Sequence, residues 1–118
     1  MARKLAAGNW KMNGTGDALG MLRTLAEDTP NSSCDILICP PATLIHRAAQ
    51  AVENTRIHIG AQDCHAETNG AHTGDLSAQM LVDAGASHVI LGHSERRQDH
   101  GETNADVHAK MQAALAQN

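Results

Sequence analysis

The sequence is nearly devoid of aromatic residues: it holds one tryptophan and neither phenylalanine nor tyrosine among 118 residues. Any hydrophobic core must therefore be built from the aliphatic residues and methionine. Apolar residue types still make up 42% of the chain, which is enough to bury a core. This length is typical of one compact domain and too short for two ordinary ones.

Three further absences exclude whole classes of protein. The cysteines Cys34, Cys39 and Cys64 are odd in number and show no CxxC spacing, which argues against a disulfide framework or a zinc site. Nine basic and thirteen acidic residues give a net charge of −4 with no basic stripe, so a nucleic-acid surface is not expected. No apolar run is long enough for a secretory signal or a membrane span, so we expect a cytoplasmic protein.

What is present is an alternation of short apolar runs and helical patterns. The runs lie at 5–7, 36–39, 57–59 and 89–91, and each is followed by loop residues and then by apolar residues at helical spacing. Such alternation predicts an α/β fold of four βα units with parallel strands and right-handed crossovers. Because the strands are continuously apolar, we expect both of their faces to be buried.

The helical faces can be read residue by residue. Ser77 and Gly85 bracket a short helix, and Thr103 with Asp106 resembles a capping box that opens the last one. The apolar positions that share a helical face are Leu19, Leu22, Leu25 and Ala26, then Leu44, Ile45, Ala48, Ala49 and Val52, and finally Val107, Met111, Ala114 and Leu115.

Periodicity leaves two architectures open: a doubly wound open sheet, or half of an eight-stranded barrel. A doubly wound nucleotide-binding sheet favours GxGxxG after the first strand. Gly14-Thr15-Gly16 does not complete that motif. The nucleotide-binding interpretation is therefore weak.

Polar residues follow two of the predicted strands directly. Asn9-Trp10-Lys11 follows the first strand, and Gly92-His93 follows the fourth. The carboxyl ends of parallel strands meet at one edge, where α/β proteins place their sites. A helix N-terminus at His93 would disfavour the imidazolium form and suit a neutral hydrogen-bond donor. Glu95 is placed to organise Lys11 or a substrate proton, whereas a solvated lysine and a core histidine are the simpler alternatives.

Other candidate motifs are weaker. The eight histidines match no HxH or HExxH spacing, so we expect no metal site. Gly92-x-Ser94 has Arg96 where a nucleophile elbow needs its second glycine, which disfavours a serine hydrolase. We interpret Arg96 and Arg97 as solvated side chains or structural ion-pair partners. The long loop over 62–75 is either functional, including a partner contact, or simply flexible.

Taken together, these motifs resemble those of the triosephosphate isomerase family. The resemblance rests on Asn9-x-Lys11, Thr73-Gly74-Asp75, the run over 92–97 and Gly101-Glu102-Thr103, and it spans essentially the whole chain in the family's order. It implies a (β/α)8 TIM barrel of which this chain holds only the first four βα units. Residues 1–118 would then be the N-terminal half of one TIM-barrel domain.

The resemblance also implies a role for each matching residue. Lys11 would bind the substrate and stabilise its negative charge, and Asn9 would line the pocket. His93 would be the neutral electrophile that polarises the substrate oxygens. Ser94 and Glu95 would hold the network around Lys11 and His93.

The implied reaction interconverts dihydroxyacetone phosphate and D-glyceraldehyde 3-phosphate through an enediol(ate), in glycolysis and gluconeogenesis. It would need neither a metal nor an organic cofactor. Thr73 would reach across a homodimer to support the neighbour's site. The family's glutamate base lies in the second half of its sequence, so we expect the isolated chain to be inactive.

Four parallel strands curved as in a barrel would leave two open edges and an uncovered apolar inner face. We therefore expect the chain to pair with the missing half, or with a copy of itself, rather than to persist as a monomer. The alternative function is a self-associating, non-catalytic half-barrel that binds phosphorylated ligands weakly at most.

Overall fold

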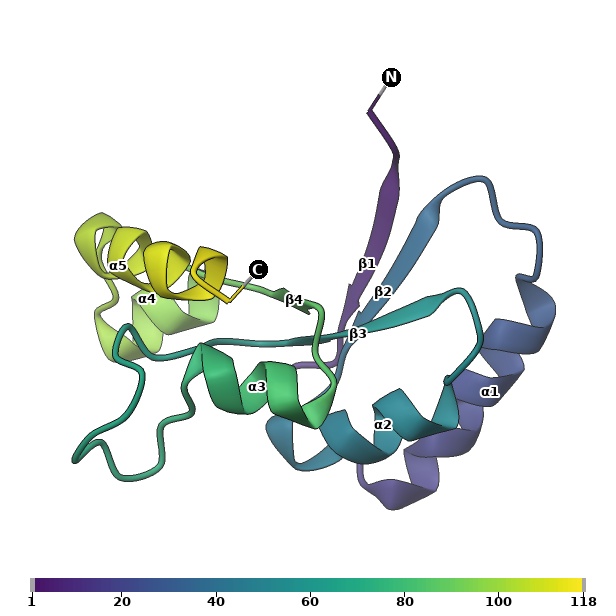
Figure 1. Ribbon diagram of the computed structural model, residues 1–118, viewed down its shortest axis with the longest axis horizontal. Coiled ribbons are helices and arrows are strands. Elements are labelled where there is room, and N and C mark those ends of the chain that lie inside the picture. Colours follow the sequence, from purple (N-terminus) through teal and green to yellow (C-terminus); the bar gives the residue numbers. More distant parts are fainter. Residues whose placement is uncertain (1, 118) are drawn as a thin grey trace.

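The computed structural model describes residues 2–117 as an α/β half-barrel built on four parallel strands (Figure 1). The strands lie side by side in chain order, which confirms the predicted alternation and the parallel sheet. Their bounds are β1 Leu5–Asn9, β2 Asp35–Cys39, β3 Ile57–Ala61 and β4 His88–Val89.

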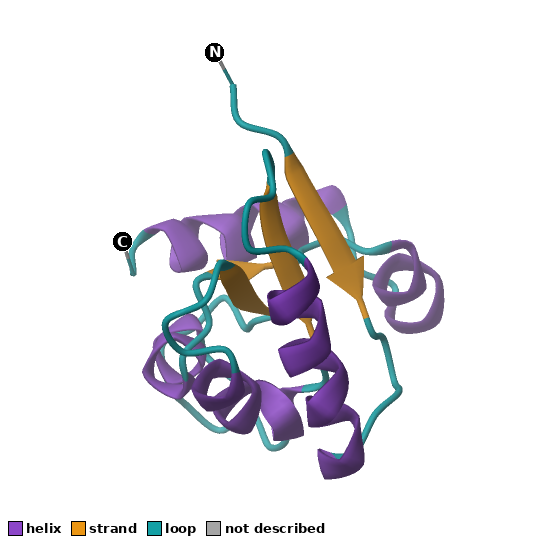
Figure 2. Cartoon of the chain, turned by 90° about the vertical axis from the view of Figure 1, so that its right-hand side faces the viewer, coloured by secondary structure: helices purple, strands orange, loops and turns teal. Residues whose placement is uncertain are grey.

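Five α-helices connect or follow these strands: α1 Leu19–Asp28, α2 Ile45–Ala51, α3 Ala78–Ala84, α4 Ser94–His100 and α5 Asn104–Leu115. Single 3-10 turns, Gly16–Ala18 and Ala42–Leu44, precede α1 and α2. Helices α1, α2 and α3 lie together along one side of the sheet, and α4 and α5 lie beyond the carboxyl end of β4 (Figure 1). Figure 2 shows the strands in the middle of the molecule with the helices around them.

The predicted helix boundaries are confirmed at the caps of α3 and α5. The Ser77 side chain accepts a hydrogen bond from the Met80 amide, and Gly85 ends α3 in the left-handed region with φ 114°. At α5 the Thr103 side chain accepts from the Asp106 amide, while the Asp106 carboxylate accepts from the Thr103 amide. This reciprocal pair satisfies two donors that a helix start leaves free.

The register of the strands brings their carboxyl ends to one rim. Asn9 pairs with Cys39 at the ends of β1 and β2, and Ala61 pairs with Val89 at the ends of β3 and β4. The Trp10 amide extends the first pairing by donating to the Cys39 carbonyl at 3.1 Å. Whatever follows each strand is therefore delivered to the same edge of the sheet.

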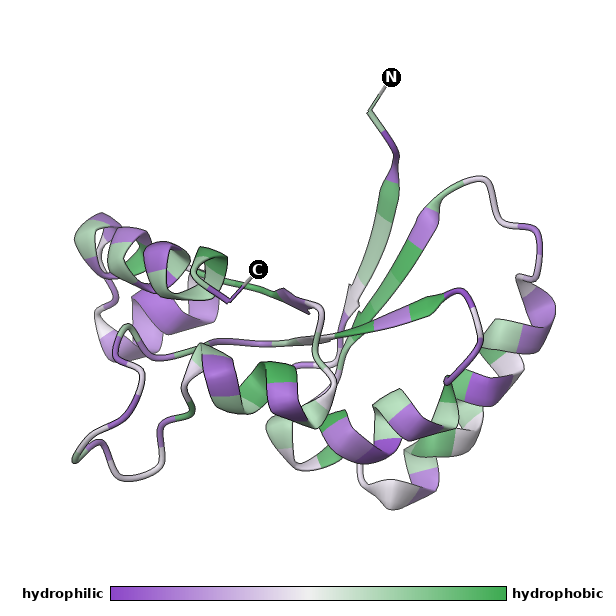
Figure 3. Cartoon of the chain, in the orientation of Figure 1, coloured by the Kyte–Doolittle hydropathy of each residue, from purple (hydrophilic) through white to green (hydrophobic). Residues whose placement is uncertain are grey.

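The core lies between the sheet and helices α1, α2 and α3. Apolar and polar positions alternate along these helices, and their apolar positions coincide with the faces expected from the sequence (Figure 3). Burying each large aliphatic side chain contributes about 1.5–3 kcal/mol, which fixes the helices against the strands. The core residues include Leu22, Ile36, Ile45, Ala48, Val52, Ile57, Ile59, Ala61, Ala78 and Leu81.

Three expectations were wrong in part. Strand β1 is exposed over its first three residues, with Leu5 47% exposed, because it lies at the edge of the described sheet. Strand β4 ends at Val89 rather than Leu91; the Ile90 amide still donates to the Ala61 carbonyl, but Gly92 at φ 67° turns the chain away. On α5 the predicted apolar face is only partly covered, and Met111 is exposed along with Leu115.

Within residues 2–117, no helix combines the length and the apolar character that crossing a bilayer requires.

Candidate active site

A cavity of about 570 Å³ opens at the carboxyl rim of the strands. Four of the residues singled out from the sequence line it: Asn9, Lys11, His93 and Glu95. They come from the end of β1 and the start of α4, which are more than 80 positions apart in the chain (93 − 11 = 82). The structure therefore brings together the residues that the strand-end pattern selected, while the role of each stays a prediction.

Lys11 occupies an unusual backbone conformation. Its φ is 56°, in the left-handed region, which costs a non-glycine residue about 1–2 kcal/mol. The Asn9 side-chain oxygen compensates by accepting from the Lys11 amide at 2.8 Å. The Lys11 Nζ lies 2.6 Å from Glu95 Oε1, so the ammonium group reaches from the end of β1 to the first turn of α4.

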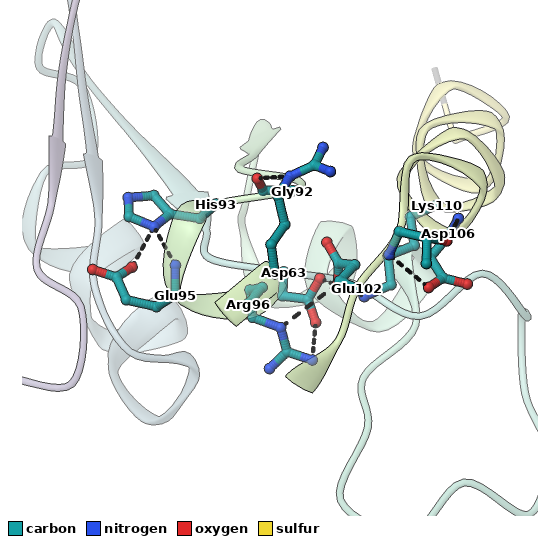
Figure 4. A network of polar contacts seen from close by, with 10 residues as sticks. Asp63, Gly92, His93, Glu95, Arg96, Glu102, Asp106 and Lys110 are labelled. Carbon is teal, nitrogen blue, oxygen red and sulfur yellow. Dashed lines mark hydrogen bonds and ion pairs between the residues drawn. The ribbon is translucent and has the colours of Figure 1, made fainter. Parts of the chain in front are cut away.

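His93 is the N-cap of α4 and faces Glu95 (Figure 4). Its Nδ1 lies 3.4 Å from the Glu95 amide and also contacts Glu95 Oε2, while Ser94 Oγ lies 3.5 Å away. The two Glu95 contacts require opposite states of Nδ1, since an amide needs its lone pair and a carboxylate needs a proton on it. The Nδ1–carboxylate contact is the shorter of the two. A neutral imidazole whose Nδ1 accepts from the amide therefore requires the Glu95 carboxylate to turn away from Nδ1 toward Lys11, which holds its other oxygen.

Glu95 is ionised in this arrangement. The hydrogen bond from Lys11 holds the pKa of the Glu95 carboxyl below its ordinary value of 4.5. A carboxylate bound in this way neutralises the charge of the lysine. An anionic ligand entering the cavity can replace it as the partner of the ammonium group.

A second group of charges, which we call the α4–α5 charge cluster, consists of Asp63, Arg96, Glu102 and Lys110, and its members Asp63 and Arg96 also line the rim cavity. Arg96 lies between Asp63, at 3.3 Å, and Glu102, at 3.7 Å (Figure 4). Lys110 Nζ contacts Asp63 at 3.0 Å and Glu102 at 2.5 Å. These contacts tie the loop after β3 to α4 and α5, and confirm the structural interpretation of Arg96.

Burial sets the electrostatics of this cluster. Burial alone would raise the pKa of Glu102, but the hydrogen bond and charge of Lys110 outweigh it and hold the pKa below 4.5. For Lys110, burial alone would lower the pKa, and the hydrogen bonds to Glu102 and Asp63 raise it above 10.5 instead. Lys110 and Glu102 are thus held in their charged forms as a buried ion pair.

Thr73 lies away from the residues that line the rim cavity. It is exposed on the long loop between β3 and α3, whose neighbouring residues Gly74 and Asp75 do reach the cavity. Its contact with a partner subunit therefore stays a prediction. The loop itself is as long as expected and lies at the rim, next to the site.

The sequence reasoning missed Gln62, which lines the same cavity. Its side-chain amide hydrogen-bonds to backbone carbonyls in the segments after β1 and at the end of β2. Gln62 directly follows β3, which ends at Ala61, two residues beyond the predicted run 57–59, and Lys11 and His93 closely follow their strands in the same way. Applying the strand-end rule to all four strands would have found it.

Two of the three cysteines, Cys39 and Cys64, are buried. Burial raises the pKa of the Cys39 thiol to about 11, and burial also raises the pKa of Cys64, so both thiols stay protonated. No three His, Cys, Asp or Glu side chains within residues 2–117 gather closely enough to hold an ion.

The chain is similar to known proteins along nearly its whole length. A family model described as triosephosphate isomerase matches residues 4–118. The chain is 67% identical over 115 residues to the triosephosphate isomerase of Ruegeria pomeroyi, covering 98% of this chain and 46% of that protein. It is 57% identical over 118 residues to that of a Jannaschia species, covering 100% of this chain and 48% of that protein.

A solved structure extends the comparison to the fold. The crystal structure of triosephosphate isomerase from Bartonella henselae superposes with a TM-score of 0.94 at 51% identity. The superposition covers 98% of this chain and 48% of the Bartonella chain. The half-barrel therefore matches half of a TIM barrel, and the chain spans about half the length of the relatives it matches.

Proposed function

The chain belongs to the triosephosphate isomerase family, and from that premise we propose that it supplies the N-terminal half of a triosephosphate isomerase site. The complete enzyme would interconvert dihydroxyacetone phosphate and D-glyceraldehyde 3-phosphate. The observation that carries the proposal is the meeting of Lys11 and His93 on Glu95 at the rim cavity. A cation and a neutral imidazole at one rim suit an anionic substrate with a carbonyl group.

Each rim residue would have a distinct task. The Lys11 ammonium group would exchange Glu95 for the substrate and stabilise the negative charge that develops in the enediolate. The His93 Nε2–H would donate to the substrate oxygens, while Nδ1 would accept from the Glu95 amide at the start of α4. Asn9 would hold the Lys11 backbone at the edge of the pocket, and Ser94 would help to orient the imidazole. No cofactor takes part in this chemistry.

The base that removes the carbon-bound proton has to come from elsewhere. Glu95 is engaged by Lys11 and is held ionised by it, so it acts as the partner of that lysine rather than as a free base. Proton abstraction beside a carbonyl needs a positioned carboxylate. We therefore expect no turnover by the isolated 118-residue chain.

We propose a homodimer for the complete enzyme, in which Thr73 of one subunit supports the site of the other. The exposed loop that carries Thr73 projects from the rim and offers a surface for that contact. A cytoplasmic location follows from the proposed place of the reaction in glycolysis and gluconeogenesis.

The alternative function is a self-associating, non-catalytic half-barrel, and the exposed edge strand favours it. Strand β1 carries an open row of backbone donors and acceptors beside the exposed Leu5 side chain. Light scattering after size-exclusion chromatography should show a dimer or a larger assembly of the pure chain. A stable monomer at micromolar concentration would contradict this expectation.

Complementation tests the proposed catalytic function. The chain is assayed for triose phosphate isomerisation alone and after refolding with the remaining C-terminal part of the Ruegeria pomeroyi relative. We expect activity only in the mixture, and none when the chain carries Lys11→Ala. A mixture that assembles into a stable complex but does not turn over would refute the proposal, and turnover by the chain alone would refute its dependence on a second segment.

A further inference from the structure

Gln62 makes two hydrogen bonds that reach across the rim. Its Nε2 donates to the Lys11 carbonyl and to the Cys39 carbonyl, each at 2.9 Å. Both partners can only accept, so the nitrogen of the amide faces them and both of its protons are used. One side chain at the end of β3 thereby joins the segments that follow β1 and end β2.

The bond to Lys11 satisfies a group that the sheet leaves free. The β1–β2 pairing ends where the Trp10 amide donates to the Cys39 carbonyl. Beyond that point the chain turns through the left-handed conformation of Lys11, and its carbonyl has left the ladder. Both Nε2 protons of Gln62 are used in the hydrogen bonds to these two carbonyls.

The bond also fixes the direction of the Lys11 side chain. The Asn9 side-chain oxygen accepts from the Lys11 amide at 2.8 Å, and Gln62, at the end of β3, donates to the Lys11 carbonyl. With both backbone groups pinned, the Cα–Cβ vector of Lys11 is set, and its ammonium group reaches Glu95. Releasing one of the two pins allows the backbone to relax toward the ordinary φ region.

We propose that Gln62 is a positioning residue, whose side-chain amide holds Lys11 in the left-handed conformation that aims its ammonium group at Glu95 and into the rim cavity. Gln62 itself touches no reacting atom in this account. The orientation of Lys11 toward Glu95 follows from the geometry alone. Its effect on the affinity for an anionic ligand rests on the proposed function.

The first test follows the Glu95 carboxyl through a pH titration by carbon-13 NMR on the full chain. Gln62→Met keeps the length of the side chain and removes both donors, and Gln62→Asn is one methylene too short to reach both carbonyls. We expect the titration midpoint of Glu95 to rise toward 4.5 in Gln62→Met, with Gln62→Asn in between. Gln79→Met, on the exposed face of α3, is the matched control and should leave the midpoint unchanged.

The second test measures the affinity for 2-phosphoglycolate by calorimetry on the same variants. We expect Gln62→Met to bind about tenfold more weakly than the unmodified chain. If neither the unmodified chain nor its mixture with the C-terminal part of the Ruegeria pomeroyi relative binds this anion, the proposed function fails, and the Glu95 titration still decides the role of Gln62. If Gln62→Met lowers only the melting temperature and changes neither the titration nor the affinity, Gln62 is merely structural and the inference is wrong.

A measurement on the unmodified chain covers the case in which the variants do not fold. Both side-chain amide protons of Gln62 should exchange with solvent at least about tenfold more slowly than those of the exposed Gln79. Equal exchange rates would show that the two hydrogen bonds do not form and would overturn the inference.

Discussion

Helix α4 contributes side chains to two groups of charges that differ in burial. On the rim side, the Lys11 and Glu95 side chains are 53% and 47% exposed. In the α4–α5 charge cluster, the Lys110 and Glu102 side chains are 13% and 4% exposed. Both groups contain lysine–glutamate pairs of nearly the same length, 2.6 and 2.5 Å.

The difference shows why similar pairs serve different purposes. An exposed pair contributes little to stability, because water screens it and the side chains lose entropy, so its members can exchange partners with a ligand. A buried pair is costly to break, because removing one member leaves the other charge without water or a counterion. We infer that the buried cluster fixes α4, and that the rim group uses the position so fixed.

The largest effect on stability should come from Glu102→Ala. It leaves Lys110 buried with only Asp63 as an anionic partner, and we expect the free energy of unfolding to fall by about 3–5 kcal/mol. Urea denaturation followed by circular dichroism measures the change. Glu27→Ala, on the exposed surface of α1, is the matched control; an equal effect from the two substitutions would refute the distinction between the groups.

Gly92→Ala, directly before His93, should cause the next largest loss of stability. A Cβ atom at Gly92 would lie 2.8 Å from the Val107 side chain, and the φ of 67° disfavours any residue with a side chain. We expect a loss of about 3 kcal/mol. Gly101 has nearly the same φ, 65°, but open space around it, so Gly101→Ala should cost only about 1 kcal/mol. Equal losses would show that contact with α5 is unimportant.

Acid should affect the two groups differently. The pKa of Glu102 is lowered on folding, so its contribution to stability is present above pH 4.5 and is lost as the pH falls through the folded value. One such proton changes the free energy of unfolding by at most about 1.4 kcal/mol per pH unit. Between pH 6 and 3, roughly the range where carboxyls titrate, the free energy of unfolding should depend less steeply on pH in Glu102→Gln than in the unmodified chain. This pH dependence should change less in Glu95→Gln. A larger change in Glu95→Gln than in Glu102→Gln would contradict the difference between the rim group and the α4–α5 charge cluster.

The smallest effect on stability should come from Lys11→Ala. Its partner Glu95 is half exposed, so we expect a change within about 0.5 kcal/mol in the free energy of unfolding. The same substitution should abolish measurable binding of 2-phosphoglycolate. Lys4→Ala is the control for both measurements, since Lys4 is exposed before β1. A large destabilisation by Lys11→Ala would show that the rim group is structural.

The sequence predicted the parts of this molecule that depend on local signals. Apolar spacing located the strands and helices, and polar residues after strands located Lys11 and His93. Because parallel strands end at one edge of the sheet, polar residues that follow different strands could be predicted to lie close together.

The remaining features depend on tertiary contacts. Lys110 looks like an ordinary solvated charge on a helix, and only the fold brings it to Asp63, 47 positions earlier in the chain. Gln62 carries no charge, and its partners are backbone carbonyls that a sequence does not display. The exposure of β1 follows from its place at the edge of the described sheet, which apolar content alone does not reveal.

The central claim is that Lys11 and His93 form one anion site, and a titration with 2-phosphoglycolate followed by nitrogen-15 NMR tests it most directly. The Lys11 Nζ and His93 ring signals should both shift, and both curves should fit a single dissociation constant. Signals that stay unchanged, or that follow two different constants, would contradict the claim.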